Sequence, residues 1–260
     1  MTMRGDHAEV FDRSLSGQAA VVTGASSGLG RATAVALARA GADVVLVARA
    51  PEDLESAAAE VRGAGGRALV VPGDLASAQV AERVVNGAVD AFGRIDVLVN
   101  AAATDAPGPV ADLPTDAWDR VMQVNLRAPF LLGQAAFRHM RAAGRGTIVN
   151  VSSVAGKRGW ANAAAYCASK FALTGLTQAF AAEARAHGIR VCVLYPGAMA
   201  TSWGAWSSVE RRGTDRGAPP PARALAPERV AELIVWIAAA PRELVLNEVI
   251  VSPLEEEGWP

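Results

Sequence analysis

Seven short runs of aliphatic and β-branched residues alternate along this chain with longer segments of helical pattern, and no other feature constrains the fold as strongly. The runs are apolar throughout, which is typical of strands buried on both faces of a sheet. Neighbouring parallel strands need a crossover segment, usually a helix, between them. The sequence therefore predicts an α/β fold, a doubly wound, seven-stranded parallel sheet with helices on both faces. The runs begin at Ala19, Asp43, Ala68, Asp96, Gly146, Ile189 and Asn247.

These patterns fill the chain from residue 16 onward, so we expect one domain over residues 16–260 after a polar tail, residues 1–15. Residues 198–227 break the alternation and are rich in Gly, Pro, Ser and Arg. A long irregular insertion in a compact domain is usually a lid or a disordered loop, and we expect a substrate lid there. The N-terminus lacks the apolar run of a signal peptide, and the longest apolar runs are too short to span a bilayer. We therefore expect a cytoplasmic protein that does not bind a membrane.

Charge and composition argue against several classes of function. The formal net charge of −1 disfavours a nucleic-acid binder that depends on phosphate contacts. Cys167 and Cys192 lie among small apolar residues and are expected to be buried, reduced thiols. The three histidines, His7, His139 and His187, do not have the spacing of metal ligands, so no metal site is expected.

The segment TGASSGLG joins the first strand run to the first helical pattern and contains Gly24, Gly28 and Gly30. Glycines at such a turn let the backbone approach a diphosphate, and the free N–H groups of the helix N-terminus bind it. An ordinary tight turn is also rich in glycine, so the glycines alone leave that alternative open. The position of this turn between a strand and a helix favours a dinucleotide site.

The end of the second strand run indicates which dinucleotide is bound. NAD-binding proteins usually have Asp or Glu there to bind the adenosine ribose, but this chain has Ala48 followed by Arg49. An arginine pairs with a 2′-phosphate that a carboxylate would repel. We therefore predict NADP(H) in preference to NAD(H), the alternative being that Arg49 is an ordinary solvated side chain. Asp74, after the third run, is expected to meet the adenine, to cap a helix, or to do both.

Tyr166 and Lys170 are four residues apart in a helical pattern, so they share one face of the helix. The choice of lysine is notable because the chain has only two, Lys157 and Lys170, and its other basic residues are arginines. A free phenol has a pKa of about 10, too high for acid–base work near neutral pH, and a nearby ammonium lowers it. The pair therefore predicts an acid–base site, although an exposed helical pair is the alternative.

Two further polar residues are candidates for the same site. Ser153 follows the fifth strand run, at the carboxyl edge of the predicted sheet where ligands bind, and its hydroxyl is placed to donate to a substrate carbonyl oxygen. Ser152 competes with it for this role. Asn125 lies in a long helical pattern, where asparagine has poor propensity, and either holds a proton-carrying water or is a buried structural amide.

Together these residues resemble the short-chain dehydrogenase/reductase family, which has a Rossmann-type fold, and the likeness runs from about residue 16 to residue 253. TGASSGLG is similar to the cofactor turn of the family, and VNAAA from Val99 stands in the place of its Asn-Asn-Ala-Gly segment. Within that segment, Ala101 replaces a frequent asparagine, and Ala103 replaces a frequent glycine and adds a methyl group near the nicotinamide. The motif residues that match its catalytic tetrad and its Pro-Gly and Thr segment are Asn125, Ser153, Tyr166, Lys170, Pro196, Gly197 and Thr201.

The resemblance implies a role for each matched residue. Tyr166 would be the general acid or base, and Lys170 would lower its pKa and bind the nicotinamide ribose. Ser153 would polarise the carbonyl and is selected over Ser152 by its spacing from Tyr166, while Asn125 would hold a relay water. The expected cofactor-binding residues are Gly24, Ser26, Ser27, Gly28, Leu29, Gly30, Arg49, Asp74, Leu75, Asn100, Ala101, Ala102, Tyr166, Lys170, Pro196, Gly197, Met199 and Thr201.

The resemblance also implies a largely apolar, aromatic substrate pocket. Three functions remain open: an NADP(H)-dependent carbonyl reductase or secondary-alcohol dehydrogenase, which we favour; a 3-oxoacyl-thioester reductase that needs an acyl-carrier protein; and a dinucleotide-sensing protein without catalysis. A homotetramer or homodimer is expected, built on the helices around residues 113–141 and 164–186. The expected pocket residues are Ala103, Ser153, Trp160, Tyr166, Met199, Trp203 and Trp206.

Overall fold

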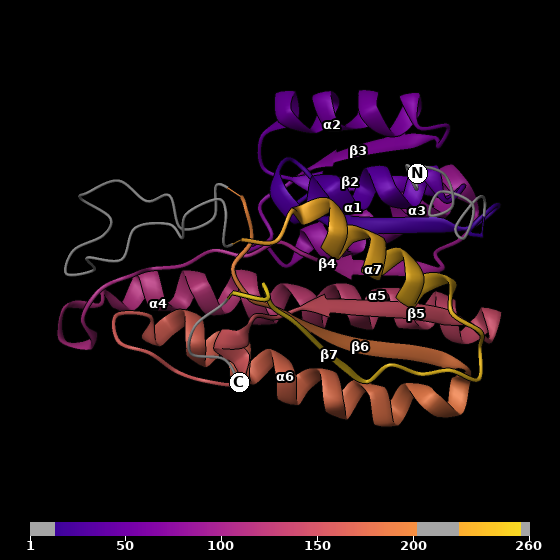
Figure 1. Ribbon diagram of the computed structural model, residues 1–260. Coiled ribbons are helices and arrows are strands. Elements are labelled where there is room, and N and C mark those ends of the chain that lie inside the picture. The colour runs from indigo at the N-terminus through magenta and orange to yellow at the C-terminus, as the bar shows by residue number, and fades with distance from the viewer. Residues whose placement is uncertain (1–13, 202–223, 256–260) are drawn as a thin grey trace, which may run out of the picture.

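Each of the seven apolar runs forms a strand in the computed structural model, which describes residues 14–201 and 224–255 (Figure 1). The strands join one parallel sheet of order β3-β2-β1-β4-β5-β6-β7. This arrangement confirms the predicted fold class. The strands are β1 (Ala19–Thr23), β2 (Asp43–Ala48), β3 (Ala68–Pro72), β4 (Val97–Asn100), β5 (Gly146–Val151), β6 (Ile189–Pro196) and β7 (Glu248–Val251).

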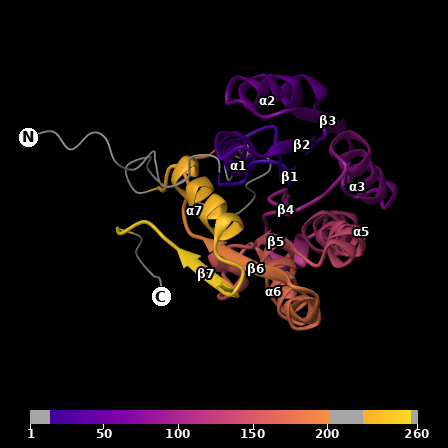
Figure 2. The same ribbon diagram turned by 90° about the vertical axis from the view of Figure 1, so that its right-hand side faces the viewer.

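Helices cover both faces of the sheet. Viewed along the strands in Figure 2, α1, α2 and α7 lie on one side, and α3, α5 and α6 lie on the other. Among the described residues no helix is long and apolar enough to cross a membrane. The helices are α1 (Gly28–Arg39), α2 (Pro51–Gly63), α3 (Gln79–Phe92), α4 (Thr115–Met122), α5 (Ala128–Ala143), α6 (Ala164–Ala184) and α7 (Pro227–Ala239).

The core consists of two apolar layers, one on each face of the sheet. Successive strand residues point to opposite faces, so Ala20 and Val22 pack in the layer beneath α1 and α7, while Val21 packs in the layer beneath α3 and α5. Burial on both faces explains why the inner strands β1, β2, β4, β5 and β6 are apolar throughout rather than alternating, whereas the edge strands β3 and β7 are partly exposed. Cys167 and Cys192 are buried and form no disulfide, as predicted.

The helical pattern expected to run without a break around residues 113–141 is divided in the structure. A π-helical turn, η3 (Gln123–Arg127), lies between α4 and α5 and contains Asn125. Such a turn accommodates an extra residue and changes the direction of its side chains. The side chain of Asn125 gains hydrogen bonds to Thr104 and Ser169 in this position, which offsets the lost regularity of the helix.

The structure changes one expected boundary and describes only part of the expected lid. Leu15, at the end of the expected tail, is fully buried, and its N–H donates to the carbonyl of Ala40. Most of the expected lid lies outside the described residues. Its two ends are close together, because Ala200 donates to the carbonyl of Leu225 and Leu225 donates to that of Ala198.

The order of the strands places a ligand site in a predictable position. From β1 the chain first proceeds to β2 and β3 on one side, and then crosses back to β4 on the other. Loops leaving the carboxyl ends of β1 and β4 therefore diverge. In open α/β sheets, ligands bind in the crevice at such a switch point.

Candidate active site

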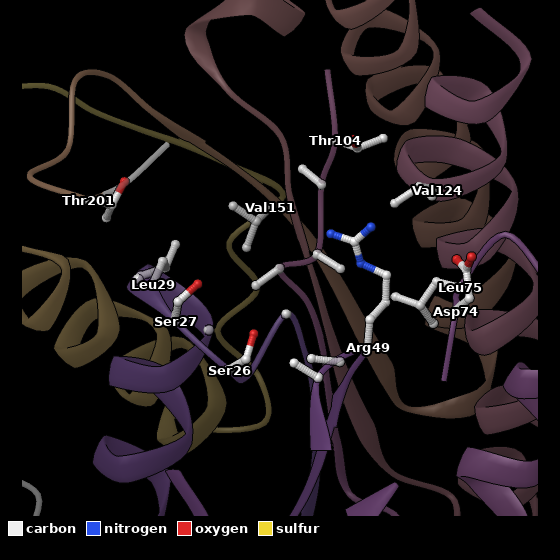
Figure 3. A pocket seen from close by; sticks show the side chains of 18 of the residues that line it. Ser26, Ser27, Leu29, Arg49, Asp74, Leu75, Thr104, Val124, Val151 and Thr201 are labelled. Carbon is white, nitrogen blue, oxygen red and sulfur yellow. The ribbon is translucent and has the colours of Figure 1, made fainter. Parts of the chain in front are cut away.

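A cavity of about 630 Å³ opens at the carboxyl edge of the sheet, where the loops after β1, β2, β3 and β4 meet the start of α6. Figure 3 shows Ser26, Ser27 and Leu29 on one wall, with Arg49, Asp74 and Leu75 on another. A cavity of this size is typical of a cofactor or small-molecule site.

The glycine turn after β1 brings backbone, rather than side chains, to the floor of this cavity. A Cβ added at Gly30 would lie 2.2 Å from the carbonyl oxygen of Gly24, and one at Gly24 would lie 2.9 Å from Cα of Ala102. Gly24 and Gly28 also have positive φ angles, +69° and +52°. The turn therefore requires glycine on steric and conformational grounds.

The first turn of α1 fits an anion. Ser27 is the N-cap residue, but its side chain makes no capping hydrogen bond, which leaves N–H groups of the first turn without that partner. The helix dipole adds partial positive charge at the same place. This uncapped helix end beside closely packed glycines is what a diphosphate requires, so the residues present fit a dinucleotide.

The end of β2 carries a cation and no carboxylate. Arg49 follows Ala48, is exposed, and points its guanidinium into the cavity (Figure 3). It forms no ion pair with any residue that the structure describes. Asp53, on the first turn of α2, also lines the cavity. Arg49 is therefore available for an anionic ligand.

Asp74 lies two residues beyond the end of β3 and binds Arg120 of α4 across the cavity wall. The distance between Nη1 of Arg120 and Oδ2 of Asp74 is 2.7 Å, and this hydrogen bond lowers the pKa of Asp74. The other oxygen accepts from the N–H of Ala76. Asp74 does not cap the next helix, since α3 begins only at Gln79.

The segment after β4 forms the wall next to the glycine turn. The N–H groups of Ala101 and Ala102 both donate to Oγ1 of Thr23, at 3.1 Å each. The side chain of Asn100 is buried away from the cavity and donates to Asn150 at 2.8 Å. Of the cofactor residues expected here, Ala101 and Ala102 line the cavity, and Asn100 supports the sheet beneath it.

Asn125 fixes the next residue of that segment. Its Oδ1 accepts from the N–H of Thr104 at 2.8 Å, and its Nδ2 donates to the carbonyl of Thr104 at 2.8 Å and to Oγ of Ser169 at 3.0 Å. The side chain is 1% exposed. The structure therefore bears out the alternative of a buried structural amide, and the relay water stays a prediction.

Tyr166 lies on the first turn of α6 with its side chain buried. Burial raises the pKa of the Tyr166 phenol above its usual range, and a hydrogen bond with Ser153 works in the opposite direction. Ser152 instead donates to the carbonyl of Lys170 at 3.3 Å. Geometry thus places Ser153, and not Ser152, beside the tyrosine.

Lys170 is 2% exposed and donates from Nζ to the carbonyl of Val151 at 2.8 Å. Nζ lies 5.5 Å from the centroid of the Tyr166 ring. Burial lowers the pKa of Lys170 to about 7. Burial is the largest influence on the Tyr166 pKa in this structure, and the expected lowering of that pKa by Lys170 stays a prediction.

The segment after β6 supplies the opposite wall. Met199 and Thr201 line the cavity, and Cγ2 of Thr201 lies 3.3 Å from where a Cβ on Gly28 would stand. Pro196 ends β6, and Gly197 donates to the carbonyl of Val251, so these two residues connect the sheet to the wall.

The expected substrate pocket is only partly assembled. Ala103, Tyr166 and Met199 line the cavity, whereas Ser153 and Trp160 are not among the residues that line it, and Trp160 is 46% exposed. Trp203 and Trp206 lie outside the described residues.

Sequence reasoning missed several residues at or near the cavity, among them Thr23, Asp105 and Arg120. Thr23 and Asp105 follow the general rule that polar residues at or after strand ends face the ligand crevice, so that position was an available signal. Arg120 lies within α4, and nothing in its sequence context indicates a partner at the end of β3. Among the described residues no group of three potential metal ligands is present.

Comparisons with known proteins agree with this geometry. A family model described as short chain dehydrogenase matches residues 18–210. The cis-4-hydroxycyclohexanecarboxylate dehydrogenase of Sinomonas cyclohexanicum is 40% identical over 234 residues, which cover 89% of this chain and 93% of that protein.

Two solved structures are similar over nearly the whole chain. A metagenomic short-chain oxidoreductase in complex with NADP is 38% identical, with a TM-score of 0.80 over 94% of this chain and 100% of the other. An NAD⁺-bound xylitol dehydrogenase is 28% identical, with a TM-score of 0.81 over 92% of this chain and 99% of the other.

Proposed function

The chain belongs to the short-chain dehydrogenase family, whose members are oxidoreductases, and from this premise we propose that it transfers a hydride between NADP(H) and a carbonyl or secondary alcohol substrate. The observation that carries the proposal is the hydrogen bond between Tyr166 and Ser153 beside the glycine-floored cavity. This pair offers one carbonyl oxygen both a proton donor, Tyr166, and a second hydrogen-bond donor, Ser153.

A nicotinamide dinucleotide bound in the cavity supplies the hydride in reduction and accepts it in oxidation. In the direction of reduction, Ser153 donates a hydrogen bond to the carbonyl oxygen, and Tyr166 transfers its proton to that oxygen as the carbon is reduced. In oxidation, Tyr166 takes the hydroxyl proton. Its raised pKa in the structure keeps the phenol protonated, which suits the role of acid.

When Lys170 carries a positive charge, it favours the ionised form of Tyr166, which is the base that oxidation needs. The negative charge of Asp105 raises the pKa of Lys170 against the effect of burial, and so favours the ammonium form. An ammonium 5.5 Å from the tyrosine ring stabilises a phenolate. Asn125 holds the relay water in this proposal, and the dinucleotide is held by the glycine turn, Arg49 and Thr201.

The preference for NADP(H) rests on Arg49. Its guanidinium points into the cavity, and the residue before it, at the end of β2, is alanine where NAD-binding proteins usually have a carboxylate. Similar structures include one bound to NADP and one bound to NAD⁺, so relatives alone do not decide the matter. The chain's own charge at this position favours the 2′-phosphate.

A secondary alcohol is also the kind of group that the relatives' names indicate. The substrate named for the first relative is a hydroxylated cyclohexanecarboxylate, and that named for the NAD⁺-bound structure is a polyol. We propose a small ring or chain alcohol, or the matching ketone, as the substrate class. The proposal includes a cytoplasmic homotetramer or homodimer that buries the exposed faces of α5 and α6.

The test is oxidation of NADPH, with NADH in parallel, over a panel of carbonyl compounds. The panel contains aryl and aliphatic ketones, aldehydes, 2- and 3-oxo esters and a 3-oxoacyl thioester. We expect turnover of ketones with a clear preference for NADPH. Turnover of the thioester alone would favour a 3-oxoacyl-thioester reductase, and tight NADPH binding without any turnover would favour a sensor.

The variant Tyr166→Phe separates binding from catalysis. Loss of general acid–base catalysis typically costs a factor of roughly 10² to 10⁴ in rate, so kcat should fall by that amount. Binding of NADPH, followed by fluorescence, should change little. Full activity in Tyr166→Phe would contradict the assigned acid–base role.

A further inference from the structure

Asp105 is a carboxylate held beside the acid–base pair by two fixed points in the chain. On one side, Asn125 binds both the N–H and the carbonyl of Thr104. On the other, the N–H of Gly108 donates to the carbonyl of Asn162, and Gly108 forms a parallel bridge with Ala163, directly before α6. Asp105 therefore lies in a short segment that spans from the cavity wall at Thr104 (Figure 3) to the start of the catalytic helix.

The position of Asp105 brings its charge to three groups at the N-terminal end of α6. Its carboxylate raises the pKa of Tyr166, Cys167 and Lys170 alike. These electrostatic interactions indicate that the carboxylate lies near the N-terminal end of α6, in the residue next to Thr104, which lines the cavity.

Asp105 has acceptor capacity that the protein does not use. One oxygen, Oδ1, accepts from the N–H of Ala106 at 2.7 Å. Among residues 14–201 and 224–255, no other hydrogen bond and no ion pair involves this side chain. A carboxylate that is mostly removed from water normally has a cation or several donors as partners, because its desolvation is otherwise costly.

We propose that Asp105 is a specificity-determining residue that accepts a hydrogen bond from a second hydroxyl group of the substrate, so that the enzyme prefers hydroxylated ketones and diols. The inference rests on the proposed function. The carboxylate fits such a donor and repels a substrate carboxylate at the same position. An apolar substrate leaves it without a partner, and so loses affinity relative to a hydroxylated one.

The experiment compares cyclohexanone with 2-, 3- and 4-hydroxycyclohexanone, using NADPH and NADH. The three isomers sample different distances between the reacting carbon and the second hydroxyl. A hydrogen bond to a charged group contributes about 1.5–3 kcal/mol, so we expect at least one isomer to exceed cyclohexanone by roughly 10- to 100-fold in kcat/KM.

Two variants of Asp105 then test whether its side chain causes the preference for hydroxylated ketones. Asp105→Ala should bring the ratio of kcat/KM values close to one, mainly by slowing the hydroxylated ketone. Asp105→Asn keeps the shape and an acceptor oxygen but removes the charge, so it should lower the ratio only in part. Asp112→Asn is the matched control, because Asp112 is exposed in the short helical turn η2 (Val110–Asp112), and it should leave the ratio unchanged.

Three results would overturn the inference. The first is a wild-type protein that does not favour any hydroxylated isomer. The second is an equal loss for cyclohexanone and its hydroxylated forms in both Asp105 variants, which would show that Asp105 only positions Tyr166 or Lys170. The third is an absence of turnover with every ketone and both cofactors, which would overturn the proposed function itself. The first two leave the proposed function intact, so the two failures are distinguishable.

Discussion

Single charged residues at or near the cavity are the basis for the expected cofactor and substrate preferences of this chain. Arg49 is one of these, since it occupies the position after β2 where the adenosine ribose is bound. We expect Arg49→Gln to lower kcat/KM for NADPH by roughly 10- to 100-fold, because a charged hydrogen bond is worth about 1.5–3 kcal/mol. The value for NADH should hardly change, since NADH has no 2′-phosphate.

Initial rates with each cofactor at a saturating ketone concentration measure this effect. Arg39→Gln is a suitable control, because Arg39 lies at the opposite end of α1 and is not among the residues that line the cavity. Equal losses with NADPH and NADH would indicate that Arg49 supports the loop and does not read the phosphate.

Asp105 also predicts a dependence of stability on pH. Burial raises the pKa of Asp105 from 3.8 to about 6, so the folded protein releases this proton at a higher pH than the unfolded chain does. Below about pH 4 both states are protonated and the group costs nothing. Between about pH 4 and pH 6 only the unfolded state ionises, so the native state loses stability, and above pH 6 the loss is complete.

Asp105→Asn removes this titration. We expect the variant to be more stable than the wild type at neutral pH, by an amount on the order of 1–3 kcal/mol, and the difference to shrink toward about pH 4. Denaturant unfolding at several pH values measures it, and Asp112→Asn shows the effect of an exposed carboxylate. A difference that grows as the pH falls would contradict the assigned burial.

At the scale of single residues, the sequence predicted which residues meet at the site better than it predicted their burial and pKa values. Tyr166, Lys170 and Ser153 are brought together as the motif implied, because helix periodicity and a strand end are local features. The depression of the Lys170 pKa was not predictable, since it depends on burial among residues distant in sequence. The ion pair of Arg120 with Asp74 was not predictable either, because Asp74 lies in the loop after β3, far from Arg120 in sequence.

At the scale of elements, the glycine turn has no room for a side chain at Gly30. A methyl group at Gly30 would lie 2.2 Å from the carbonyl oxygen of Gly24, so Gly30→Ala must displace the turn or the start of α1. Such overpacking typically costs about 1–3 kcal/mol. We expect a lower melting temperature, together with weaker NADPH binding.

Gly175→Ala is the matched control for this variant. Gly175 lies within α6, and nothing stands within 4 Å of an added Cβ. The substitution should therefore stabilise the protein slightly, by roughly 0.5–1 kcal/mol, through helix propensity. Thermal unfolding of both variants gives the comparison, and a Gly30→Ala protein as stable as Gly175→Ala would refute the steric argument.

Strands and helices were predicted well where an apolar pattern runs through the whole element. They were predicted less well where one side chain interrupts a helix. All seven strands follow from runs of apolar residues. The break between α4 and α5 does not, because it coincides with hydrogen bonds of Asn125, within η3, to Thr104 and Ser169, which are distant in sequence. Poor helix propensity at Asn125 was a hint of irregularity, but it did not specify a π-helical turn.

At the scale of the whole molecule, the layer formed by α5 and α6 leaves large apolar side chains in contact with solvent. Phe130 on α5 is 43% exposed and Phe171 on α6 is 47% exposed. Both helices lie on the same side of the sheet (Figure 2) and contact each other through Phe137 and Phe180. An apolar surface of this kind is commonly covered by a second copy of the chain.

We therefore expect the wild-type protein to run as a dimer or tetramer in size-exclusion chromatography with light scattering. Phe171→Glu places a charge in the interface, and it should shift the mass toward the monomer or weaken assembly at low protein concentration. Val110→Glu, a charge at another exposed apolar residue outside α5 and α6, should leave the mass unchanged. A wild-type monomer, or a Phe171→Glu protein with an unaltered mass, would place any interface elsewhere. Because Phe171 lies on the same helix as Tyr166 and Lys170, loss of activity together with loss of assembly would show that subunit contacts help to hold the catalytic end of α6 in place.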